Sequence, residues 1–146
     1  MTLRIQSGPE KGKTAEELLL KKPSKADFIR SSSNSVLAGE LNRLVSKLDA
    51  KDLVSTCHEC KQPATRYSIY YNNHNCMFWC DDCDPYTSGA VQGKLTIGRT
   101  FDQAITHIDL TANGKKSFKD SVIKEIAVAK GLPKRVGEAQ ALAFFA

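Results

Sequence analysis

Four cysteines occupy two short, similarly spaced motifs in the middle of the chain. Cys57 and Cys60 enclose two residues, and Cys80 and Cys83 do the same after an interval of residues 61–79. Each Cys-x-x-Cys motif can present two thiolates from one tight turn, and two facing turns complete a tetrahedral site. Four thiolates suit Zn²⁺ and leave no coordination position open for water. The spacing therefore predicts a structural Zn²⁺ site with Cys57, Cys60, Cys80 and Cys83 as ligands.

The fifth cysteine and two histidines leave an alternative ligand set open. Cys76 lies four residues before Cys80, on the same face of an extended segment, and His58 and His74 lie close to the motifs. Imidazole is also a common zinc ligand, so any of the three could replace one thiolate. The simpler interpretation is that Cys76 is a small buried strand residue and that both histidines lie at turns.

The residues between the two motifs predict a β-hairpin. Residues 65–71 and 76–79 are rich in β-branched and aromatic side chains, and the Asn-rich run between them favours a turn. Residues 94–100 alternate apolar and polar side chains and predict a third strand. A metal-capped hairpin with a third strand is a zinc ribbon. Ribbon motifs often have Gly after the second Cys, and Lys61 stands there in the first motif.

Three short helices are predicted before the ribbon. Thr14 and Glu17 have the spacing of a capping box at the start of the first helix. The second follows a proline, and we expect its Phe28 and Ile29 to face inward. Leucine spacing over residues 36–49 predicts the third helix, after a serine-rich linker.

Further helices are predicted after the ribbon. The first spans about residues 100–107 from a Thr-x-x-Gln capping box, and residues 109–114 are expected to form a loop because they end in Asn-Gly. Ser117 with Asp120 has the spacing of a cap for the next helix. Pro133, after a Gly, is expected to start the last helix at its first position.

We therefore predict an α+β protein in which a central three-stranded zinc ribbon is flanked by short N-terminal and C-terminal helices. The expected regions are residues 1–52, 53–100 and 101–146. No apolar run approaches the roughly 20 residues that cross a membrane, so no membrane partner is expected. The cysteines form metal-binding motifs and not a disulfide framework, which favours a reducing, cytoplasmic setting.

Charge suggests an anionic partner. The formal net charge is +5, from 21 basic and 16 acidic residues. Four thiolates around Zn²⁺ would subtract about two units, so the distribution of charge matters more than its total. Basic residues outnumber acidic ones over residues 115–135, and phosphate is the natural partner of such a segment. Exposed aromatic rings of the ribbon beside a basic residue would stack on bases.

These patterns predict a set of nucleic-acid-binding residues. The set is Lys115, Lys116, Lys119, Lys130, Lys134, Arg135, Arg66 and Trp79. The alternative interpretation is a solvated lysine-rich helix and aromatic rings that pack in a core. Lys134 and Arg135 are expected at a helix N-terminus, where backbone N–H groups also attract anions.

Two other functions stay open. Asp81, Asp82 and Asp84 surround the second cysteine motif and could hold Mg²⁺ for phosphodiester chemistry, although solvated charge is the simpler role. No other motif suggests a nucleophile and base, so no catalytic residue is assigned. Exposed ribbon aromatics could alternatively dock a protein partner, which would make the chain an interaction adaptor.

A further pattern spans residues 8–29. Its matching positions are Gly8, Lys11, Gly12, Lys13, Thr14, Glu16, Glu17, Leu18, Pro23, Phe28 and Ile29. In this order they resemble a small domain found at the C-terminus of exodeoxyribonuclease X-like exonucleases and in short stand-alone bacterial and phage proteins. The resemblance implies a role in DNA metabolism and is compatible with a phage origin. It transfers no catalytic residue, because that domain is not the nuclease.

Overall fold

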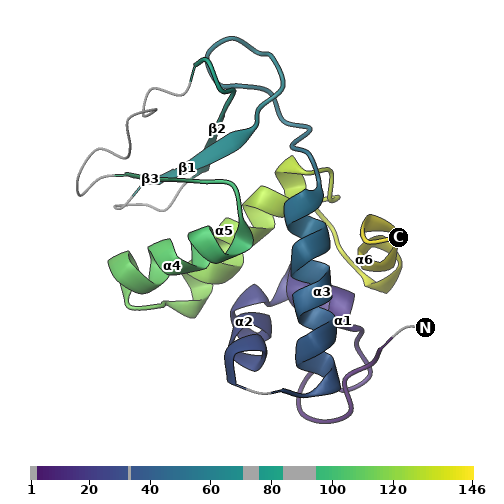
Figure 1. Cartoon of the computed structure of the whole chain (residues 1–146). Helices are drawn as coiled ribbons and strands as arrows, with labels where there is room; N and C mark the ends of the chain where they lie inside the picture. The colour runs from purple at the N-terminus through teal and green to yellow at the C-terminus, as the bar shows by residue number, and fades with distance from the viewer. Residues whose placement is uncertain (1–2, 33, 71–75, 84–94) are drawn as a thin grey trace.

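The computed structural model describes residues 3–32, 34–70, 76–83 and 95–146, with helices and strands in the described part that confirm a mixed α+β fold. The elements are α1 (Ala15–Lys21), α2 (Pro23–Ser32), α3 (Val36–Ala50), β1 (Arg66–Tyr70), β2 (Cys76–Trp79), β3 (Leu95–Gly98), α4 (Phe101–Ala112), α5 (Lys116–Ala129) and α6 (Glu138–Phe144). In Figure 1 the sheet lies at one end, beside α4 and α5, and the remaining helices gather around α3.

The strands form an antiparallel sheet in the order β2-β1-β3. Ile69 of β1 pairs with Cys76 of β2, and Tyr70 of β1 pairs with Leu95 of β3. The strand predictions agree with these bounds to within two residues at each end, and β2 has the predicted bounds. The predicted Asn-rich turn lies outside the described residues.

One cluster of buried side chains joins the helices to the sheet. The apolar face of α3 contributes Leu41 and Leu44, while Tyr67 and Ile69 of β1 belong to the same cluster. Burying one such side chain contributes about 1.5–3 kcal/mol. The cluster contains residues from all three regions expected from the sequence, so the sheet is packed on the helices through shared core contacts.

Local hydrogen bonds set the helix starts as predicted. The Thr14 hydroxyl accepts the Glu17 N–H at 3.1 Å, and the Ser35 hydroxyl accepts from Ala38 at the start of α3. At α4 both halves of the capping box between Thr100 and Gln103 are present. Each bond satisfies a backbone donor that a helix start leaves without an intrahelical partner.

The loop predicted over residues 109–114 is confirmed only at its Asn113-Gly114 turn, and the predicted cap of α5 is wrong. Helix α4 continues to Ala112 and ends at Asn113, whose φ of 53° is left-handed. Ser117 lies inside α5, and no side-chain bond caps that helix. The Asp120 carboxylate instead accepts the backbone N–H of Ser24 at 2.9 Å, so it serves the start of α2.

The predicted helix start at Pro133 is also wrong. Gly131 has φ 108°, and the Leu132 N–H bonds the Ala127 carbonyl at 3.0 Å, which is the Schellman pattern that ends a helix. Leu132 is buried, and this anchors the reversed chain against the core. The residues after it are irregular until α6 begins at Glu138.

Of the two side chains of α2 predicted to face inward, Ile29 packs against the core and Phe28 does not. The buried residues of α2 are Pro23 and Ala26, and Ile29 continues that face because it lies three positions further. Phe28 is off this face and 68% exposed, so the expectation that it faces inward is wrong.

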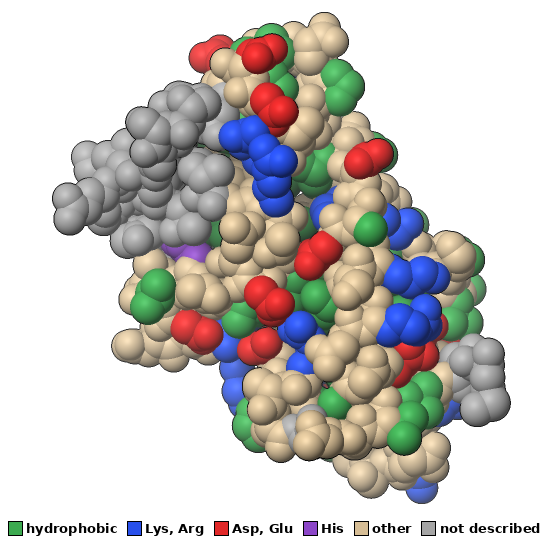
Figure 2. Space-filling model, in the orientation of Figure 1, with side chains coloured by type: hydrophobic (Ala, Val, Ile, Leu, Met, Phe, Trp, Pro, Cys, Tyr) green, Lys and Arg blue, Asp and Glu red, His purple; other side chains and the backbone are tan. Residues whose placement is uncertain are grey.

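The surface shown in Figure 2 carries basic and acidic side chains interspersed over the helices, with no continuous basic stripe on this face. None of the helices in the described part of the chain is long and apolar enough to cross a bilayer.

Candidate metal centre

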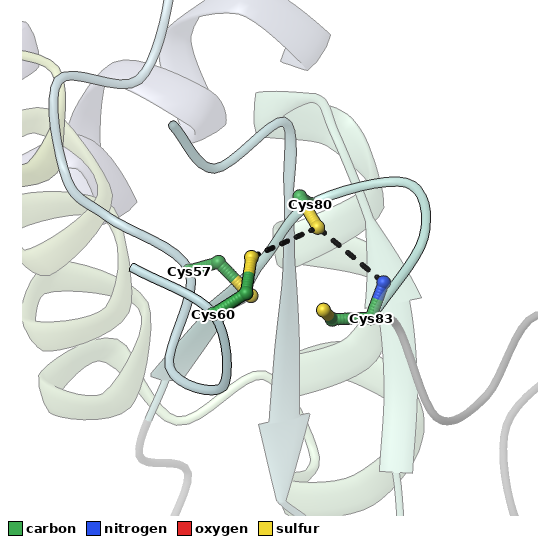
Figure 3. Close-up of side chains that lie close together, drawn as sticks. All are labelled: Cys57, Cys60, Cys80 and Cys83. Atoms are coloured by element: carbon green, nitrogen blue, oxygen red, sulfur yellow. Dashed lines mark hydrogen bonds between the residues drawn. The ribbon is translucent and has the colours of Figure 1, made fainter. Parts of the chain in front are cut away.

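Four thiols converge where the loop after α3 meets the end of β2. The sulfur atoms of Cys57, Cys60, Cys80 and Cys83 all lie within 4.8 Å of one another, and those of Cys60 and Cys80 are 3.7 Å apart. Figure 3 shows the four side chains pointing toward a common centre from two loops. This arrangement can hold a metal ion.

The first motif is shaped by its own backbone hydrogen bonds. The Cys57 N–H bonds the Gln62 carbonyl at 2.6 Å, and the Lys61 N–H returns to the Cys57 carbonyl at 3.1 Å. Lys61 has φ 63°, in the left-handed region that glycine adopts without steric cost. The position that often carries Gly in ribbon motifs therefore has the backbone conformation of a glycine, with a lysine occupying it.

Backbone bonds between the first motif and β2 bring the two loops together. The His58 N–H bonds the Phe78 carbonyl at 2.9 Å, and the Thr65 N–H bonds the Trp79 carbonyl at 2.8 Å. Because β2 ends at Trp79, the next residue, Cys80, emerges beside the first motif. The hairpin pairing thus sets the separation of the two pairs of thiols.

The environment of the thiols favours anionic sulfur at one position and protonated sulfur at another. Burial raises the pKa of Cys57, but backbone hydrogen bonds from Cys60, Cys80 and Glu59 outweigh it and bring the pKa to about 6. Hydrogen bonding with the Cys60 and Cys80 side chains raises the pKa of Cys83 to about 12. Four thiolates this close repel one another, so a bound cation is what would favour the loss of all four protons.

The alternative ligands do not join the cluster. Cys76 lies on β2, is buried, and has its pKa raised by burial and by the nearby Glu125 of α5. His58 is exposed, and its ring makes an edge contact with Trp79 at 5.5 Å. His74 lies outside the described residues. Among the described residues the ligand group therefore consists of the four cysteines of the two motifs.

Both nucleic-acid-binding residues predicted on the sheet are engaged within the protein. The Arg66 guanidinium pairs with the Asp81 carboxylate, and its side chain is only 15% exposed. Trp79 is buried, and its indole N–H donates to the Ser68 hydroxyl at 3.0 Å. Trp79 therefore has no exposed ring face for a base, because it serves the core of the sheet.

Among the described residues, the carboxylates around the second motif do not form an open magnesium site. Asp81 accepts a hydrogen bond from the Thr65 hydroxyl and pairs with Arg66 and, at 3.5 Å, with Arg99. The hydrogen bond from Thr65 is the largest of the effects that lower its pKa. Asp82 is exposed, and Asp84 lies outside the described residues. Asp81 thus links the start of β1 to the residue that follows β3.

Two of the predicted lysines have structural contacts. The Lys119 ammonium lies 3.0 Å from Asp109 and 3.6 Å from Asp27, with its side chain 13% exposed. Lys130 is buried and donates to the Leu48 carbonyl at 2.7 Å, which satisfies a backbone acceptor near the end of α3. Burial lowers the pKa of Lys130. Neither ammonium is presented to solvent as the sequence pattern suggested.

The other predicted basic residues are exposed. Lys115 and Lys116 lie at the start of α5, where the Lys115 ammonium sits 4.7 Å from the centre of the Phe118 ring. Lys134 and Arg135 are exposed in the irregular segment before α6. Their expected place at a helix N-terminus is wrong, because the Schellman turn delays that helix.

A cluster of charged side chains near the N-terminus is not predicted by any motif in the sequence. Lys22 and Lys25 both contact the buried Glu10 carboxylate, at 2.7 and 2.6 Å. Hydrogen bonds from these two lysines lower the pKa of Glu10 to about 2. No sequence signal identifies this cluster, since Glu10 lies in a loop whose packing depends on tertiary contacts.

Comparison of the chain with family models, with curated proteins and with solved structures gave no match. The metal centre is therefore characterised by its own geometry.

Proposed function

We propose that the two motifs bind one Zn²⁺ and that the sheet with its loops is a zinc ribbon. Zn–S bonds of about 2.3 Å give a tetrahedron whose sulfur atoms are about 3.8 Å apart. The 3.7 Å between the Cys60 and Cys80 sulfurs fits that edge. With four thiolate ligands the metal would supply cross-linking of the two loops and no Lewis-acid chemistry, because no position stays open for a substrate.

We further propose that the protein binds nucleic acid through its helices. The supporting observation is the location of the charged side chains that have no ion pair within the described residues. Exposed basic residues of the helical part that have no ion pair within the described residues include Lys11, Lys21, Lys115, Lys116, Lys124, Lys134 and Arg135.

The metal end has the opposite balance. Glu59 and Asp82 lie inside the two motifs, are exposed, and have no ion pair within the described residues. Four thiolates around Zn²⁺ would add two negative charges there, against the exposed Lys61. A phosphate backbone would therefore be attracted to the helices and repelled from the metal end. The resemblance of residues 8–29 to the exonuclease-associated domain supports a partner in DNA metabolism.

Salt-dependent binding tests this function. We expect the zinc-loaded chain to shift a mixed-sequence DNA in a mobility assay, with affinity falling at least about tenfold between 50 and 200 mM salt. Replacing both Lys115 and Lys116 with Glu should weaken binding, while Lys61→Glu at the metal end should change it little. Absence of binding to any DNA or RNA at low salt would overturn the proposal.

A protein-binding adaptor is the second candidate. Val36, Val54 and Leu110 are 78%, 69% and 79% exposed, so these apolar side chains are accessible to a protein partner. Under this alternative, purification from a native source would yield a protein complex that survives nuclease treatment and 0.5 M salt. Under the nucleic-acid proposal, co-purifying material would be lost under those conditions.

A further inference from the structure

A groove of about 500 Å³ opens between the first turns of α2 and α5. Its walls are formed by Lys22, Ser24, Lys25, Phe28, Lys116 and Asp120. The hydrogen bond from the Ser24 N–H to the Asp120 carboxylate, at 2.9 Å, joins the two helix starts and fixes the groove. Its volume lies in the range of sites that hold small ligands or single nucleotides.

The groove carries excess positive charge. Lys22 and Lys25 share one carboxylate, that of Glu10, whose side chain is only 3% exposed while theirs are 52% and 41% exposed. Lys116 is exposed and has no ion pair within the described residues. Three ammonium groups thus face solvent beside two carboxylates, of which Glu10 is covered and Asp120 bonds the Ser24 N–H. An anion would find donors here that the fold leaves available.

An aromatic ring borders the same groove. Phe28 is 68% exposed, because a position two residues from the buried Ala26 lies on the opposite side of α2. A large exposed ring adds little to the stability of the fold and leaves a flat apolar face accessible to a ligand. Rings beside basic groups bind single strands, because each unpaired base offers a flat face and each linkage a phosphate. In a duplex those base faces are covered by neighbouring pairs.

We propose that this groove binds single-stranded nucleic acid, with a base stacked on Phe28 and phosphates contacted by Lys22, Lys25 and Lys116. The inference rests on the proposed function and narrows it, because it names the form of nucleic acid and the place of contact. It also assigns binding to residues that were not among those predicted from the sequence, apart from Lys116.

Fluorescence anisotropy with the full, zinc-loaded chain tests the groove. The probes are a labelled oligothymidylate of about 15 nucleotides and a blunt hairpin duplex of equal phosphate number. We expect the single strand to bind more tightly. Phe28→Ala should weaken it about tenfold while leaving duplex binding within twofold, and Phe28→Tyr, which keeps a ring, should restore most of the affinity.

The charge contacts have a separate readout. Lys116→Gln should reduce the slope of log affinity against log salt by about 0.7 for the single strand, the value for one lost phosphate contact. Lys61→Gln, an exposed lysine at the metal end, and Val36→Ala, an exposed apolar residue of α3, are the matched controls and should leave affinity unchanged.

The possible failures are distinguishable. Equal affinity for the hairpin, or Phe28→Ala equal to wild type on the single strand, would overturn the groove while salt-dependent binding still supported the wider proposal. Groove variants that weaken an acidic peptide and no nucleic acid would overturn it in favour of a protein partner. Absence of binding to either probe by the wild-type chain would overturn both proposals.

Discussion

Lys61 has a backbone conformation that a lysine adopts only at a steric cost. The first cysteine motif needs a left-handed residue after Cys60, and Lys61 adopts φ 63° there. For an L-residue this conformation costs about 1–2 kcal/mol relative to the usual helical region. The Lys61 ammonium donates to the His58 carbonyl at 3.1 Å, which offsets part of that cost.

Replacing Lys61 with glycine should therefore stabilise the protein. We expect Lys61→Gly to raise the free energy of unfolding by up to about 1 kcal/mol, because relief of strain exceeds the entropy that glycine adds to the unfolded chain. Lys61→Val is the matched variant and should lower stability, since β-branched residues avoid positive φ. Urea unfolding at fixed zinc concentration measures both, and an equal loss in the two variants would contradict this explanation.

Glu10 predicts a pH dependence at the same scale. Its pKa in the folded protein is about 2, below the ordinary 4.5, because Lys22 and Lys25 hydrogen-bond to the carboxylate. The ionised form therefore stabilises the fold above pH 4.5, and this contribution is lost as pH falls toward 2. Glu10→Gln should be less stable than wild type at pH 7, and the difference should shrink as the pH falls from about 4.5 toward 2.

The matched control for Glu10 is Glu40→Gln, which removes a pair, three residues apart within one helix, with the exposed Arg43. Such pairs contribute little, so this variant should follow the wild-type profile of stability against pH. A Glu10→Gln variant whose deficit is the same at pH 7 and pH 3 would show that the carboxylate charge is not what stabilises the loop.

At the scale of elements, sequence predicted what local chemistry determines. The bounds of β2 and the caps at Thr14 and Thr100 depend on a few adjacent residues, and the structure has them as predicted. The sequence does not predict the end of α4, because residues 109–112 continue the helix and only Asn113 and Gly114 form the turn.

In the candidate site too, the sequence predicts what depends on local spacing and does not predict what depends on tertiary contacts. Four metal ligands follow from spacing along the chain, so the sequence contained them. Burial depends on contacts between distant elements, so Trp79 and Lys130 looked available in the sequence and are enclosed in the fold. The sequence predicts a buried Phe28, whereas the side chain is exposed, because contacts with neighbouring helices determine which face α2 buries.

Lys130 yields a prediction that separates a structural lysine from a binding one. Its ammonium satisfies the Leu48 carbonyl, and thereby ties the end of α3 to the end of α5. Lys130→Met should lower the free energy of unfolding by about 1 kcal/mol, because the Leu48 carbonyl loses the ammonium donor and keeps only the Lys51 N–H at 3.1 Å. Nucleic-acid affinity of the folded fraction should not change, whereas Lys116→Gln should reduce affinity and leave stability intact.

The measurement for Lys130→Met is chemical denaturation alongside a binding titration under conditions where both variants are folded. A loss of affinity with unchanged stability would mean that this lysine contacts the ligand after all. That result would return the binding surface to the end of α5, where the sequence pattern had placed it.

In the whole molecule, two regions of opposite charge balance share one hydrophobic core. Within the described residues, the sheet end carries the thiols and carboxylates that have no ion pair, while the helical part carries lysines that have none. Residues such as Tyr67 and Ile69 connect the two through shared packing. The division at residues 52 and 100 stays a prediction, and loss of metal is expected to affect the helical part as well because the core is continuous.

Metal content is the most direct test of this account, because the proposed ribbon depends on the four-thiolate site. Elemental analysis of purified protein should give one zinc per chain, retained in Cys76→Ser and lost in Cys60→Ser and Cys80→Ser. Since Cys76 is buried away from the cluster, it is the matched control for loss of a thiol. A zinc-free chain that keeps its fold in chelator, or full zinc content in Cys80→Ser, would contradict the account.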